Sequence, residues 1–129
     1  MTGADIIGAL LLNDPPVPAG QIKEDRLPDN VALPAFLVRT ISSVDRQTLK
    51  PGALVRQTDR IAVTVRAGSV KERKAAIKWI RECCAGKTGE IAGALRVSVL
   101  TAGKGPSVNG PGNSYEQTQD FRVSFEAPI

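Results

Sequence analysis

The chain has 129 residues, 42% of them hydrophobic and 4% aromatic, and its 17 basic and 13 acidic residues give a net charge of +4. This length predicts a single domain, and the hydrophobic fraction is too high for a wholly disordered chain. The basic excess forms no block along the sequence, which argues against a sequence-specific nucleic-acid binder. A soluble surface of mixed charge is favoured, with weak attraction to phosphates as the alternative.

Histidine and cysteine usage restricts the chemistry. The chain has no histidine, so it lacks the commonest general base and the commonest metal ligand. Cys83 and Cys84 are adjacent on a predicted helix, where neighbouring side chains point about 100° apart, so they are poorly placed for a bridge or a metal site. Free thiols fit assembly in a reducing cytoplasm. Neither a basic n-region nor a long apolar segment is present, so we expect no signal peptide and no membrane span.

A short helix is expected over residues 2–13. Thr2 can cap it, Asp5 lies near its positive end, and its apolar stripe consists of Ile6, Ile7, Leu10 and Leu11. Prolines at 15, 16 and 18 end it. The turn-rich stretch that follows contains one short extended piece, around residues 21–23.

Two strands come next. Residues 35–43 carry apolar side chains on both faces, and a polar turn containing Pro51 and Gly52 follows. Residues 53–67 form one long strand or two pieces joined at a bulge. Within them Ile61, Val63 and Val65 alternate with polar or small residues, which is typical of a half-buried strand.

The central helix is expected over residues 69–85. Ser69 and Glu72 fit a capping box, and Gly86 suits the position after the last turn. Its buried face consists of Val70, Ile77, Ile80 and Cys84. A second apolar stripe consists of Ala76, Trp79 and Cys83. We favour a place for Trp79 at the edge of the chain's own core, with contact to another subunit as the alternative.

The last two strands contain Leu95, Val97 and Val99, and then Phe121, Val123 and Phe125. Between them, residues 102–114 hold four glycines and two prolines, which predicts a long exposed hairpin loop, mobile or dependent on a partner for order. The expected fold is therefore a single α+β domain over residues 1–129, with two helices and a mostly antiparallel sheet.

No motif for catalysis or for a cofactor stands out. Gly86, Lys87 and Thr88 match the end of a phosphate-binding loop, but Arg81 occupies the place of its first glycine and the segment follows a helix. The carboxylates are scattered without metal-ligand spacing, among them Asp25, Asp29, Asp59, Glu116 and Asp120. We therefore expect no enzyme, no metal and no cofactor.

In order and texture, the chain resembles the tail-terminator, or tail-completion, proteins of long-tailed bacteriophages and gene-transfer particles. The resemblance lies in the N-terminal helix, residues 33–38 (LPAFLV), residues 57–66 (QTDRIAVTVR) with the Ala-rich helix that follows, and residues 115–125 (YEQTQDFRVSF). It implies a virion protein, assembled in the bacterial cytoplasm, that forms a ring, commonly a hexamer. Such a ring sits on the head-proximal end of the tail tube, ends tube polymerisation and joins the head-completion, or neck, protein.

This resemblance also assigns candidate surfaces. Ala76, Trp79 and Cys83 are candidates for a subunit interface, because a ring needs two different patches that meet. The loop residues Lys104, Val108, Asn109 and Asn113 are candidates for contact with the tail-tube protein, the head-side protein or a neighbouring subunit. Genomic DNA would pass through the bore unread. Arg56, Arg60 and Arg66 are candidates for lining that bore, although simple surface solvation is favoured. A head-closure protein of the same particle, or a small host enzyme or ligand-binding protein, remains an alternative.

Overall fold

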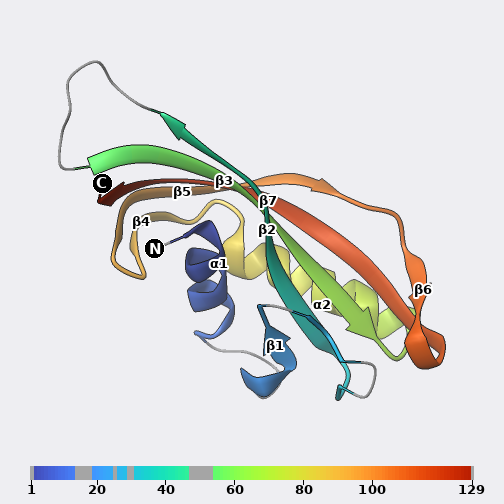
Figure 1. The fold of residues 1–129 in the computed structure, drawn as a ribbon. Helices are drawn as coiled ribbons and strands as arrows, with labels where there is room; N and C mark the ends of the chain where they lie inside the picture. The colour runs from blue at the N-terminus through green and yellow to red at the C-terminus, as the bar shows by residue number, and fades with distance from the viewer. Residues whose placement is uncertain (1, 14–18, 25, 29–30, 47–53, 129) are drawn as a thin grey trace.

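The computed structural model describes residues 2–13, 19–24, 26–28, 31–46 and 54–128. A seven-stranded sheet curves over two helices, α1 (Gly3–Leu11) and α2 (Val70–Cys84), which cover the same face (Figure 1). The predicted α+β class is confirmed. No helix in the described part of the chain is long and apolar enough to cross a membrane.

The strands follow the order β1-β2-β3-β7-β5-β4, and β6 pairs with β7. Every pair is antiparallel except β1 with β2. Their bounds are Ile22–Lys23 for β1, Ala35–Arg46 for β2, Leu54–Ala67 for β3, Thr88–Ile91 for β4, Ala94–Lys104 for β5, Val108–Gly110 for β6 and Ser114–Pro128 for β7. Short 3-10 turns occupy Ala19–Gln21 and Pro111–Asn113.

The centre of the sheet is the pairing of β3 with β7, which runs without a register shift from Leu54 opposite Pro128 to Ala67 opposite Tyr115. The segment predicted as one strand or two is thus a single strand. A bulge does occur, but on β2, between Thr40 and Ser42. The predicted short extended piece is β1, which pairs with the start of β2.

The core lies between the sheet and the helices. Alternate residues of the central strands are 0–1% exposed, and they pack beneath the apolar stripes of both helices: Phe36, Val38, Ile61, Val63, Val65, Phe121, Val123, Phe125, Ile6, Ile7, Leu11, Ile80 and Cys84. The expected burial of Val70 is wrong, since its side chain is 41% exposed. As the first residue of α2, it lies beyond the part of the helix that packs on the sheet, where Ala76 and Ile77 are buried instead.

Both helices are capped by their own sequence. At α1, the Thr2 hydroxyl accepts from the Asp5 amide (3.3 Å), and the Asp5 carboxylate accepts from the Thr2 amide (2.9 Å), which completes a capping box. At α2, the Ser69 hydroxyl accepts from the Glu72 amide (3.1 Å). The Glu72 carboxylate accepts from the Gly68 amide (3.2 Å), one residue earlier than the predicted box requires. Gly86 takes the left-handed conformation, with φ +75°, as its place after the helix predicts.

Strand β5 departs from the simple alternation that the sequence suggests. Arg96 has φ +50°, and the register with β7 shifts between Leu95 and Ser98. This bulge places Ala94 and Val97 in the core and leaves Leu95 39% exposed, which breaks the simple alternation.

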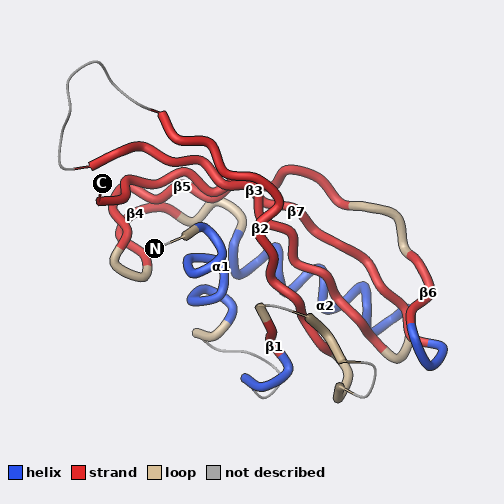
Figure 2. The backbone as a smooth tube through the Cα atoms, in the orientation of Figure 1, coloured by secondary structure: helices blue, strands red, loops and turns tan. Residues whose placement is uncertain are grey.

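The predicted loop over residues 102–114 does join neighbouring strands, but most of it carries regular structure. Strand β5 continues to Lys104, opposite Gln119, and β6 then pairs with the first residues of β7. The chain reverses in the 3-10 turn at Pro111–Asn113, where Gly112 has φ +64°. Figure 2 shows the resulting arm of the sheet, with β6 along its edge.

Candidate interaction surfaces

The described residues contain no group of three or more His, Cys, Asp and Glu side chains that could hold a metal ion. Burial, with a smaller contribution from neighbouring Cys83, raises the pKa of the Cys84 thiol to about 12, so this thiol stays protonated at neutral pH. Among the surfaces formed by the described residues are two grooves, an open sheet face and a free strand edge.

The first groove, of about 400 Å³, lies between α1, α2 and β4, and we call it the Trp79 groove. Its lining residues are Leu10, Asn13, Trp79, Glu82, Cys83, Lys87, Thr88 and Ile91. The ring centroid of Trp79 lies 5.2 Å from that of Phe36 at an interplanar angle of 63°. Trp79 therefore packs at the edge of the chain's own core, as favoured from the sequence, while one side of it borders the groove. Of its stripe, Ala76 is buried and Cys83 is half-buried.

This packing makes Trp79 a stability residue whatever else it contacts. We expect Trp79→Ala to lower the free energy of unfolding by about 2 kcal/mol, because a half-buried indole and its edge-to-face contact with Phe36 are lost. Urea unfolding measures the change. Lys78→Ala, at a neighbouring position with a 79% exposed side chain, is the control. Equal midpoints for the two variants would contradict the packing role.

The second groove, of about 480 Å³, lies between α2 and the arm formed by β5 and β7, and we call it the basic groove. Lys74, Lys78, Arg81 and Lys104 line it together with Glu82, Ile77 and Gln117. Of the predicted loop residues, Lys104 lines this groove. Val108 (52% exposed) and Asn109 lie on β6, and Asn113 lies at the turn with φ +60°.

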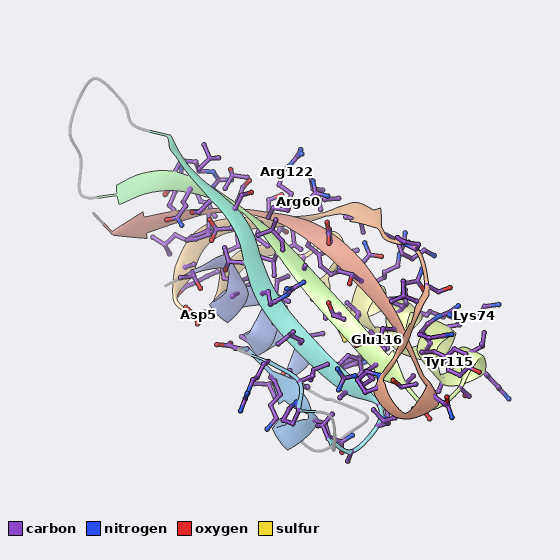
Figure 3. The ribbon with its side chains drawn as sticks, turned by 45° about the vertical axis from the view of Figure 1, so that its right-hand side comes forward. Asp5, Arg60, Lys74, Tyr115, Glu116 and Arg122 are labelled. Carbon is purple, nitrogen blue, oxygen red and sulfur yellow. The ribbon has the colours of Figure 1, made fainter. Side chains whose placement is uncertain are left out.

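The sheet face turned away from the helices, which we call the open face, carries polar side chains that form pairs between neighbouring strands. Arg60 donates two hydrogen bonds to Asp120 (2.7 and 3.0 Å), and Arg66 donates one to Glu116 (3.1 Å). The hydroxyls of Thr58 and Ser124 are 3.1 Å apart, and those of Thr64 and Thr118 are 3.0 Å apart. Figure 3 shows Arg60 beside Arg122 on this face.

The three arginines proposed from the sequence for a bore have different environments. The surface placement expected for Arg66 is wrong: it is 8% exposed, and it also donates to the Pro28 carbonyl (2.8 Å). Arg56 donates to the Arg96 carbonyl (2.7 Å). Arg60, with a 42% exposed side chain, pairs with Asp120.

Two further arginines on the open face were missed by the sequence reasoning. Arg39 and Arg122 are exposed, and neither has a hydrogen bond or ion pair within the described residues. The strand alternation carried the signal, because Arg122 lies between the buried residues Phe121 and Val123, and Arg39 follows the buried Val38. The functional importance of Arg122 became visible only from the strand pairing, which places it directly opposite Arg60.

The last surface is the outer edge of β2. Strand β1 covers it only at Phe36 and Leu37, and no other described strand pairs there. Along the uncovered stretch, Ile41 is 52% exposed and Val44 is 65% exposed. An unpaired strand edge with exposed apolar side chains is a ready site for association with another chain.

No protein-family model and no curated protein matches this sequence. Among solved structures, the chain is similar to a chain from the structure described as "Virion of native gene transfer agent (GTA) particle". The TM-score is 0.65 at 12% sequence identity, and the match covers 97% of this chain and 95% of the other. At this identity the likeness concerns the fold.

Proposed function

We propose that this protein is a structural, non-enzymatic virion component of a phage-like particle, and that it forms the ring that ends the tail tube. The observation that carries the proposal is the fold likeness to a gene transfer agent virion chain, which extends over nearly the full length of both chains. The resemblance of the sequence to tail-terminator proteins supports the finer role. In this role the hexameric ring sits at the head-proximal end of the tail and contacts the tail-tube and neck proteins.

The ring requires a heterologous interface, in which one patch of a subunit meets a different patch of the next copy. We assign one to the Trp79 groove, which Trp79 and Cys83 line, whereas Ala76 of the same stripe is buried in the subunit. We assign the other to the β2 edge, because Ile41 and Val44 are apolar, exposed and adjacent to unpaired backbone. An apolar edge entering a partly apolar groove of the next copy buries both.

The arm residues Lys104, Val108, Asn109 and Asn113 are assigned to contact with the tail-tube or head-side protein. Val108→Asp is expected to reduce head-to-tail joining severalfold without loss of folding, because a half-exposed apolar contact becomes a desolvated charge. Joined particles are counted by electron microscopy, with Leu95→Asp, at a 39% exposed apolar residue of β5 outside the arm, as the control for added charge. Joining at the unaltered level in the Val108 variant would remove the arm from the contact.

Electron microscopy of particles made without this protein tests the function itself. Overlong tails are expected, because tube polymerisation then has no stop. Normal tails on heads that leak their DNA would instead assign the protein to head closure. Light scattering of the purified protein adds the oligomeric mass, and a monomer under particle-forming conditions would contradict a ring.

A further inference from the structure

The open face of the sheet carries positive charge that the described residues do not neutralise. Three carboxylates on this face already pair with arginines: Asp120 with Arg60, Glu116 with Arg66 and Glu126 with Arg96. Arg39 and Arg122 have no such partner among the described residues. We infer that this face binds the phosphate backbone of double-stranded DNA, through Arg39, Arg60 and Arg122, without reading its sequence.

The placement of the three side chains is fixed by strand register. Arg122 on β7 lies directly opposite Arg60 on β3, and Arg39 on β2 lies opposite Ala62, which is itself opposite Asp120. Since neighbouring strands are about 4.8 Å apart, the three cations occupy a compact patch two strand spacings wide. Like charges directly opposite each other disfavour the folded sheet. Because Arg122 makes no side-chain hydrogen bond or ion pair with the described residues that would offset this cost, an external anion accounts best for the arrangement.

The chemistry of the face fits a phosphate backbone better than other anionic partners. Guanidinium groups bind phosphate oxygens with two parallel hydrogen bonds, and hydroxyls such as those of Thr58 and Ser124 add donors. The Phe and Trp side chains all pack on the helix side, so the described part of this face offers no aromatic platform for unpaired bases. The absence of such a platform favours a DNA duplex over a single strand. The described part of the open face also lacks the aromatic anchors that are typical of protein contacts.

The inference deepens the proposed function, on which it rests for the occupant: a ring at the tail tube has genomic DNA in its bore. It assigns the open face to that bore. The arginines concerned are Arg39, Arg60 and Arg122. Arg56 and Arg66, which the sequence analysis named as bore candidates together with Arg60, are not included.

The test uses the intact protein and a short fluorescein-labelled DNA duplex of arbitrary sequence, with binding followed by fluorescence anisotropy over a salt series. The double variant Arg39→Gln/Arg122→Gln is expected to bind roughly tenfold more weakly, or worse, at low salt. The plot of its log affinity against log salt is expected to become less steep, and the magnitude of the negative slope should decrease by about 2 for each subunit in contact. The matched control Lys74→Gln/Lys78→Gln removes two charges from the basic groove on the helix side and is expected to leave the slope unchanged. Asp120→Asn frees Arg60 and is expected to strengthen binding severalfold.

Loss of affinity in the lysine control equal to that in the arginine variant would overturn the inference, since net charge alone would then explain binding. So would unchanged duplex binding in the arginine variant; if head-to-tail joining failed in that variant, the face would instead serve an acidic protein. Light scattering on the same samples separates the two proposals. A ring with arginine-independent binding refutes only this inference, and a monomer with arginine-dependent binding refutes only the ring.

Discussion

Replacing Asp59 by alanine is expected to lower the free energy of unfolding by about 3 kcal/mol, the largest effect we anticipate for a single polar substitution. Asp59 lies on β3 and is 1% exposed. Its carboxylate accepts from the Gly3 amide (2.7 Å), the Ser43 hydroxyl (2.6 Å) and the Gln57 amide (3.0 Å). The substitution removes a charged acceptor at the positive end of α1 and leaves the Gly3 amide and the Ser43 hydroxyl without this acceptor, whereas Gln57 keeps its hydrogen bond to Ser43 (2.8 Å).

Urea unfolding of matched variants tests this anchor. Ser43→Ala removes one of the three donors and is expected to cost about 1 kcal/mol. Gly3→Ala tests the close approach from the helix side, because a Cβ there would lie 2.8 Å from the Asp59 Cβ and 2.9 Å from its Oδ2. We expect a clear loss of stability in that variant as well. If Asp59→Ala matched Ser43→Ala, the carboxylate would be acting as an ordinary surface acceptor, and the anchor would be rejected.

The Asp59 anchor also shows where sequence reasoning reached its limit. Local chemistry was predictable: the caps at Thr2 and Ser69 and the glycine after α2 depend on residues within four positions of one another. The contact between Gly3 and Asp59 joins residues 56 positions apart, and the local sequence of neither segment predicts it. Asp59 was one of several scattered carboxylates until strand pairing brought it to the start of α1.

Strand faces were predictable only where the alternation was unbroken. Phe121, Val123 and Phe125 are buried as expected, because β7 pairs with β3 in a single register. The alternation breaks at Leu95, because Arg96 adopts a left-handed conformation. That conformation is uncommon for a residue other than glycine, and no pattern in the sequence indicates it. The four-residue strand β4 was missed, since two of its residues, Thr88 and Gly89, look like a turn after the helix.

The candidate surfaces divide in the same way. Trp79 could be placed at the core edge from helical spacing alone. The contribution of Arg122 required knowing that β7 lies between β3 and β5, which no local pattern contains. Burial of Arg66 likewise depends on Pro28 and Glu116, which come from distant parts of the chain. Interaction surfaces are therefore less accessible from sequence than the core, because they depend on which strands become neighbours.

The double variant Ile41→Lys/Val44→Lys is expected to convert the ring into monomers. Each interface would then have to bury lysines on the β2 edge, at a cost of about 3 kcal/mol, which weakens association more than a hundredfold. Folding should be unaffected, because the two side chains are 52% and 65% exposed in the subunit. Light scattering measures the mass. Leu100→Lys is the control, since Leu100 is a 55% exposed apolar residue of the same sheet, on β5, away from this edge.

A cross-link identifies the surface that the β2 edge meets. With Val44→Cys, a short bismaleimide is expected to join this position to native Cys83 of the next copy and to give a ladder of covalent oligomers. Cys83 is half-buried at the Trp79 groove, whereas Cys84 is buried and its raised pKa keeps it unreactive. Adding Cys83→Ser should abolish the ladder. If covalent dimers form without Cys83, two β2 edges meet each other, and the head-to-tail arrangement that a ring requires is excluded for this contact.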